Sequence, residues 1–261
     1  MCAVPSPEAG DGRPGHRAIE ASIAAFARQR EWLALLAGLL FVGWLLPPVV
    51  HWARSYEWVE ALQFSAFAIV VPGLFVAGAP WRRLGLAGWA ARLSAGRQRH
   101  REVGRVIALS APAPLAWIAW RLPASVNAVV RSPWLVVLEA VSLLVVGAAL
   151  WLECVESPPL VPRAVRPVRL ATAGLVMWVD WSLAYMVGFS KANWYVAYRH
   201  VPGQGVSVIA DQQLLALSMW LVAGIVIIPF VLAGLVRWLR GEEDPDEELR
   251  RMLRRQRYRP D

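Results

Sequence analysis

The chain has 261 residues, of which 57% are hydrophobic, and a mean hydropathy of +0.43. This composition argues against an ordinary soluble domain and leaves room for six membrane-crossing helices of ~20 residues each. The formal net charge is +8 and the pI is about 10.4, which in a soluble protein would suggest nucleic-acid binding. Here the basic residues follow membrane topology, with anionic lipid headgroups as their simplest partner, so we expect membrane lipids and no nucleic acid as partners.

The chain is predicted to begin with a cytoplasmic tail, residues 1–30, which lacks the apolar stretch of a signal peptide. A transmembrane helical domain, residues 31–239, is expected next. The last part, residues 240–261, is predicted to form a charged cytoplasmic helix, with Asp244 as its N-cap and Pro245 at its first position. Six apolar segments make up the membrane domain: Glu31–Val50, Glu57–Ala79, Val106–Leu122, Pro133–Glu153, Arg169–Gly188 and Gln212–Val236.

Prolines are expected to shape four of these segments, among them the sixth, which Pro229 should bend. Pro47 and Pro48 should bend the outer end of the first segment, and Pro72 the middle of the second. The third segment is the shortest and contains Pro112 and Pro114. Neighbouring helices can satisfy the carbonyls that these prolines free, so we expect a kinked span there.

The basic residues set the predicted orientation. Of the 27 Lys and Arg residues, 22 lie in the alternate stretches that start with the N-terminal tail, and five lie in the three remaining loops. Basic loops stay on the cytoplasmic side during insertion. The sequence therefore predicts an all-α polytopic membrane bundle with about six transmembrane helices and both termini in the cytoplasm.

Charged residues inside apolar segments are costly in a bilayer and mark candidate functional positions. Asp180 lies near the middle of the fifth segment, where we expect a buried neutral acid rather than a proton path. Glu60, Glu139 and Asp211 lie near the outer ends of the second, fourth and sixth segments. With the topology above, these three carboxylates are predicted to converge at the level of the outer leaflet.

Two interpretations of this outer cluster remain open. His51 and His200 lie in outer loops and, with Glu60, are the weak candidates for a copper or zinc site, because imidazole and carboxylate suit these metals. Alternatively Arg121 or Arg131 pairs with an acid and fixes the helix register. We expect Arg121 to take the place of a metal, so that no cofactor is tightly bound. No nucleotide-binding loop, nucleophile elbow, HExxH or CxxC motif is present, so no catalytic residue and no enzymatic activity are expected.

The sixth segment carries the most specific motif. It opens with Asp211, Gln212 and Gln213 and reaches Met219-Trp220, which resembles the DQQ-x-AG-x-x-MW signature of the CtaG-like cytochrome c oxidase assembly factors of bacteria, with Leu215-Ala216 at the AG. Other stretches similar to this family occur in the same order along the chain: Pro72…Gly78-Ala79-Pro80, Trp120-Arg121-Leu122-Pro123, Leu138-Glu139…Trp151 and Trp194-Tyr195-Val196-Ala197-Tyr198. The sequence is identified as a divergent member of the family.

The chain departs from the family pattern at the histidines. The family's HxxQH is Glu60, Gln63 and Phe64 here, the histidine of its WH is Arg121, and that of its EH is Ala140. The resemblance implies a multi-pass protein of the bacterial plasma membrane that assists biogenesis of a terminal oxidase, around its copper-containing subunit, with oxidase subunits as partners. The departures put a histidine copper site in doubt. The alternatives are a small transporter, with Asp180 and the outer acids lining its path, and a ligand-free membrane scaffold.

Overall fold

The computed structural model describes residues 30–81, 84–86, 88–90, 92, 103–158, 160, 162, 164–199 and 205–240. These residues form helices and no β-strand apart from one isolated bridge between Ser157 and Leu160. The predicted all-α class is therefore confirmed for the described part of the chain. The tail 1–29 and the predicted helix after residue 240 lie outside the described residues, as does His200.

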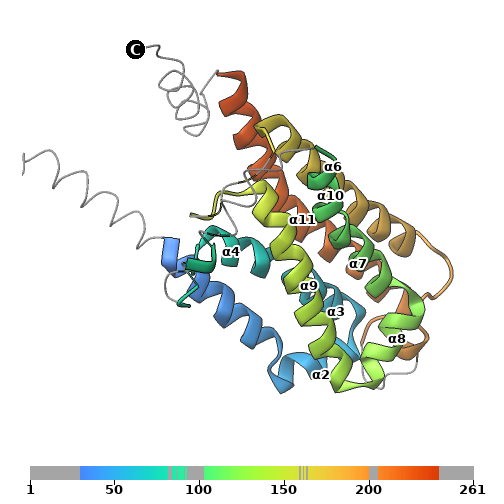
Figure 1. Ribbon diagram of the computed structural model, residues 1–261. Coiled ribbons are helices and arrows are strands. Elements are labelled where there is room, and N and C mark those ends of the chain that lie inside the picture. The colour runs from blue at the N-terminus through green and yellow to red at the C-terminus, as the bar shows by residue number, and fades with distance from the viewer. Residues whose placement is uncertain are drawn as a thin grey trace, which may run out of the picture.

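The helices follow one another along the chain in this order: a first helix Arg30–Trp44, α2 Pro47–Ser55, α3 Glu57–Ser65, the π-helical turn η1 Ala66–Val70, α4 Val71–Ala77, α6 Val103–Ser110, α7 Pro112–Arg121, α8 Pro123–Arg131, α9 Pro133–Cys154, α10 Arg166–Gly188, the 3-10 turn η2 Val196–Tyr198 and α11 Val208–Leu239. Figure 1 shows the long helices packed alongside one another, with α2 and α8 at the same end of the bundle.

Proline marks where many of these helices begin. Pro47, Pro112, Pro123, Pro133 and Pro167 each occupy the first or second position of a helix. The fixed φ of proline suits this position, and its missing N–H would have no intrahelical partner there in any case. The prolines therefore divide the apolar sequence into separate helices.

The first predicted segment is bent, as Pro47 and Pro48 predict. The first helix and α2 meet at an angle of 60°. The second segment is one span, Glu57–Ala77, interrupted by the π-helical turn η1 just before Pro72. Proline cannot donate to the carbonyl four residues earlier, so the wider turn accommodates the break.

The third predicted segment is interrupted at the prolines that are expected to kink it. It consists of two helices, α6 and α7, that meet at Ala111, and the two prolines at 112 and 114 both lie in the first turn of α7. After Arg121 the chain turns at Leu122, which is extended, as is usual before proline. The next helix, α8, lies between the third and fourth predicted segments, a stretch that the sequence assigns to an outer loop.

Small residues let the remaining helices approach closely. A Cβ on Gly188 would lie 2.4 Å from Cβ of Ala216, where α10 packs along α11. A Cβ on Gly147 of α9 would lie 2.7 Å from the carbonyl oxygen of Ala68 and 2.7 Å from Cγ of Pro72. The glycine therefore allows α9 to pack against the π-helical turn.

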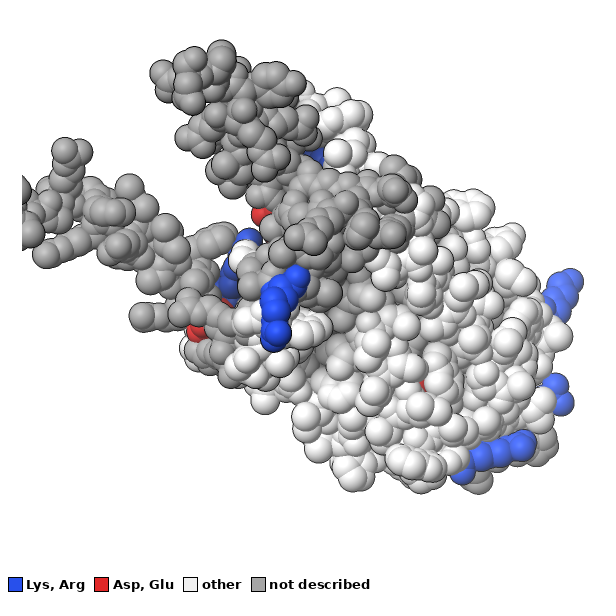
Figure 2. Space-filling model, in the orientation of Figure 1, with Lys and Arg blue, Asp and Glu red and all other residues white. Residues whose placement is uncertain are grey.

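Among the described residues, four helices are long and apolar enough to cross a membrane: Glu57–Ala77, Pro133–Cys154, Arg166–Gly188 and Val208–Leu239. The bent first pair makes a fifth if it is counted as one span. Figure 2 shows Lys and Arg side chains toward the two ends of the molecule, with a broad face between them that carries almost none. This is a membrane protein, and the sixth crossing and the orientation remain predictions.

Candidate functional site

The predicted outer ends of the segments meet at one end of the bundle, and Asp211 joins two of them. Its carboxylate accepts hydrogen bonds from the backbone N–H of Glu57 (2.8 Å) and of Trp58 (3.3 Å) at the start of α3. Tyr56, the N-cap residue of α3, offers no side-chain cap. Asp211, in the first turn of α11, therefore caps a helix that lies far away in the sequence.

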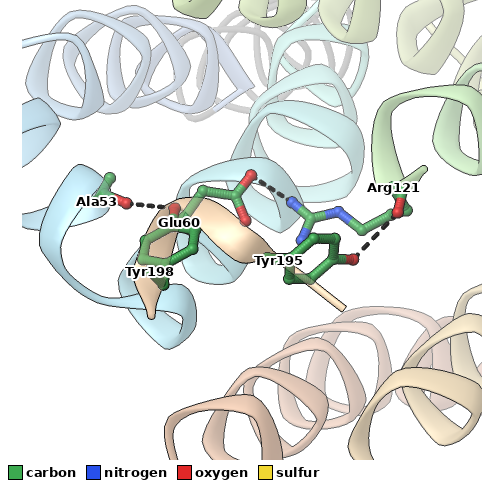
Figure 3. Close-up of polar contacts among 5 residues, drawn as sticks. All are labelled: Ala53, Glu60, Arg121, Tyr195 and Tyr198. Carbon is green, nitrogen blue, oxygen red and sulfur yellow. Dashed lines mark hydrogen bonds and ion pairs between the residues drawn. The ribbon is translucent and has the colours of Figure 1, made fainter. Parts of the chain in front are cut away.

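An ion pair between Arg121 and Glu60 lies next to this junction. Nη2 of Arg121, at the end of α7, is 2.5 Å from Oε1 of Glu60 on α3, and both residues are 2% exposed. The guanidinium also lies over the ring of Phe64, 4.1 Å from its centroid. Figure 3 shows the two charged groups pointing at one another from separate helices. The predicted pairing of Arg121 with an outer acid is confirmed, with Glu60 as the partner.

Two tyrosines tie the loop before α11 to this cluster. The hydroxyl of Tyr195 donates to the carbonyl oxygen of Arg121 (3.0 Å), and that of Tyr198 donates to the carbonyl oxygen of Ala53 (2.7 Å), as Figure 3 shows. Burial raises the pKa of both phenols above their usual value. Both therefore keep the proton that these bonds need, and they connect the loop to α7 and to α2.

Gln212 holds the segment between α10 and η2. Its Nε2 donates to the carbonyl oxygens of Val187 (2.8 Å), Ser190 (3.2 Å) and Ala192 (3.3 Å), and its Oε1 accepts from the backbone N–H of Trp194 (3.1 Å). The side chain is fully buried. The first two residues of the DQQ sequence thus act as backbone-binding groups, one on α3 and the other on the segment after α10.

The tryptophans singled out in the sequence bind neighbouring helices. Trp120 Nε1 donates to Oγ of Ser142 on α9 (2.9 Å), and Trp220 Nε1 donates to the carbonyl oxygen of Trp181 on α10 (3.1 Å). Trp151 Nε1 donates to the carbonyl oxygen of Ile69 in the π-helical turn (3.0 Å). That turn lies just before Pro72, and the indole satisfies one of its carbonyls.

The buried acids Glu57, Glu139 and Asp180 are among those with a carboxylate oxygen that has no hydrogen-bond partner within the described part of the chain. Glu57 and Glu139 both interact electrostatically with Glu60 and Arg121. Asp180 also interacts electrostatically with Arg121. The sequence did not indicate this cation as a neighbour of Asp180. Of these carboxylates and that of Glu60, the one of Glu60 forms the ion pair with the Arg121 guanidinium.

Other predicted positions lie apart from this cluster. His51 is exposed on α2, Arg131 is exposed at the end of α8, and Gln213 is exposed on α11 between its buried neighbour Gln212 and Leu214. Pro123 contributes by starting α8. The sequence prediction does not include Asn127 of α8, whose Oδ1 accepts from the backbone N–H of Ala197 (2.8 Å).

The donor set around Arg121 does not fit a copper ion. Within the described ranges, no three His, Cys, Asp or Glu side chains are grouped so as to hold a metal. The buried donors are carboxylates, which suit cuprous copper poorly, and a guanidinium among them repels any cation. What the arrangement does chemically is to fasten α2, α3, α7, α11 and the η2 segment together.

A comparison with known protein families gives a match that includes all of the described residues. A family model described as cytochrome c oxidase caa3 assembly factor matches residues 13–241. The chain belongs to this family. The match covers all of the described helices and both residues, Glu57 and Asp211, that join α3 to α11. No curated protein and no solved structure matches the chain.

Proposed function

We propose that this protein assists the biogenesis of a terminal oxidase in the bacterial plasma membrane. It does so by binding an oxidase subunit during assembly of the copper-containing subunit. The family match over residues 13–241 carries this proposal. We further propose that it acts by protein contacts, with no enzymatic activity and no tightly bound metal.

The Glu60–Arg121 pair supports the metal-free part of the proposal. The resemblance places family histidines at or beside these positions, and here a buried ion pair joins α3 to α7 instead. A charge pair at ~4 Å is worth ~4 kcal/mol at an effective dielectric of ~20, so a cation beside Arg121 would be repelled by a similar amount. A salt bridge thus links α3 and α7 at the position where a bound metal could otherwise link them.

Gln213 is the best candidate for a partner contact. It belongs to the most specific motif, yet its side chain is exposed while Asp211 and Gln212 are buried in structural bonds. Leu217 and Leu221 follow on the same face of α11 and are 48% and 51% exposed. An amide beside an apolar stripe suits the outer end of a transmembrane helix of another subunit, because helices in membranes associate through packing and interhelical hydrogen bonds.

A photo-crosslinking amino acid at Gln213 tests this contact. Irradiation of native membranes should capture an oxidase subunit, identified by mass spectrometry. The same amino acid at Leu175, which is 65% exposed on α10, is the matched control and should capture it much less. Capture of unrelated proteins alone at Gln213, with no oxidase subunit copurifying with the intact protein, would contradict the proposal.

A second candidate function is proton-linked transport, and the buried acids favour it. Asp180 is fully buried in the span α10, and neither of its oxygens has a hydrogen-bond partner among the described residues. Ionisable residues inside spans often line proton paths. Proteoliposomes with an imposed pH gradient would decide: proton flux that Asp180→Asn abolishes favours transport, and impermeability of the wild type rejects it.

A further inference from the structure

A cavity of about 260 Å³ lies at the opposite end of the bundle from the Arg121 cluster. It is formed where α9 ends, α10 begins and α11 nears its last turn, and the start of the first helix also reaches it. The topology predicted from the basic residues places this end at the cytoplasmic surface. Nothing in the proposed assembly function uses it.

The wall of the cavity is basic on one side. Four arginines line it, Arg30, Arg166, Arg169 and Arg237, together with one acid, Glu156. Nη1 of Arg169 lies 3.7 Å from Oε1 of Glu156, and its Nε donates to a backbone carbonyl (3.0 Å), so Arg169 is held in place by the protein. Even with Glu31 and Glu153, which adjoin lining residues in the sequence, the arginines outnumber the carboxylates.

The other side of the cavity is apolar. Leu170, Phe230, Ala233 and Gly234 line it. A Cβ on Gly234 would lie 2.4 Å from Cδ2 of Leu170, so α11 packs directly against the Leu170 side chain of α10 here. Nearby on α11, exposed apolar side chains such as that of Trp238, which is 50% exposed, continue toward the predicted membrane surface.

We infer that this cavity binds one anionic phospholipid, with the headgroup phosphate between the arginines and an acyl chain against the apolar wall. Guanidinium groups bind phosphate oxygens in a bidentate manner, and arginine is therefore over-represented at sites that recognise phosphate in this way. The volume accommodates a headgroup phosphate but not a whole lipid, since drug-sized ligands already need roughly 300–1,000 Å³. A soluble phosphate would use the arginines but not the apolar wall, so the combination favours a lipid.

Native mass spectrometry of the full-length protein in detergent tests the assignment. Phosphatidylglycerol and phosphatidylcholine with the same acyl chains are titrated separately. One phosphatidylglycerol should bind with a clear preference over phosphatidylcholine. The double variant Arg166→Gln/Arg237→Gln should weaken that binding about 30-fold, the effect of removing two cationic side chains beside an anionic headgroup. Arg131→Gln/Arg199→Gln, two exposed arginines at the other end, is the matched control and should leave it unchanged.

A second variant separates loss of the site from loss of the fold. Ala233→Trp fills the cavity and keeps every arginine, and it should also abolish phosphatidylglycerol binding while the protein stays monodisperse. Equal binding of both lipids, or equal weakening in the control variant, would overturn the inference. Displacement of the bound lipid by millimolar inorganic phosphate would show that soluble phosphate is the ligand, and would overturn it as well.

Discussion

Removing the charge of Asp211 should weaken the junction between α11 and α3. The carboxylate accepts two backbone N–H groups at the start of α3, and the N-cap residue Tyr56 provides no replacement. In Asp211→Asn the amide oxygen can keep one of these bonds, but the NH₂ group then faces the second donor. Asp211→Ala loses both bonds and leaves two donors of a buried helix end without an acceptor.

The magnitude follows from two contributions. Loss of an N-cap side chain costs roughly 0.5–2 kcal/mol. Loss of the negative charge at the positive end of a helix costs about 0.3–1 kcal/mol, and more where the site is partly buried. We therefore expect about 1–2 kcal/mol of destabilisation for Asp211→Asn and about 2–3 kcal/mol for Asp211→Ala.

Thermal unfolding of the purified protein in one detergent checks these values. At about 2–4 °C per kcal/mol for a chain of this size, the alanine variant should lose roughly 4–12 °C in Tm. Gln213→Ala is the matched control, because Gln213 is exposed on the same helix two residues away, and its Tm should change little. Equal Tm values for Asp211→Ala and Gln213→Ala would refute the capping role of Asp211.

Further predictions concern the ion pair, the helix packing, the metal and the topology. Arg121→Gln should destabilise the protein by roughly 3–5 kcal/mol because Glu60 is left buried without its cation, and adding Glu60→Gln should recover part of this, which a double-mutant cycle in Tm measures. Gly147→Ala should cost about 1–3 kcal/mol through its clash with the π-helical turn, whereas Gly174→Ala, with open space around it, should be neutral or slightly stabilising. Elemental analysis of the purified protein should find well under one copper or zinc per chain, and His51→Ala should not change that value. A reporter inserted after α8 should be external, and a cytoplasmic signal there would show that α6 and α7 do not cross the membrane.

The sequence predicts the helices well where a single physical signal dominates. The segments at α9, α10 and α11 are long and apolar, and their predicted bounds agree with the structure to within four residues at each end. The bend near Pro47 also follows from proline chemistry alone. An irregularity near Pro72 also follows from proline chemistry, but its contacts with the indole of Trp151 and with Gly147 could not be predicted, because both residues come from a distant helix.

The candidate site shows the same division. Convergence of Glu60 and Arg121 at one end follows from topology and charge, but the choice of Glu60 over the other acids depends on how α7 rotates against α3. Asp211 was selected by its motif, and its role as the cap of α3 is a tertiary contact that sequence spacing does not contain. Asn127 could not be predicted as a site residue, because it lies outside the six apolar segments and its contact with Ala197 is a tertiary one.

Deletion and complementation in the host test the proposed function most directly. Membranes from a strain that lacks this protein should contain less assembled oxidase, measured as oxidase subunit abundance and oxidase-dependent oxygen consumption. Wild-type protein should restore both, and so should His51→Ala, because the proposed action needs no histidine-bound metal. Unchanged oxidase abundance and activity in the deletion strain would contradict a role in oxidase assembly. Failure of His51→Ala alone, in a variant that accumulates normally, would contradict action without a bound metal.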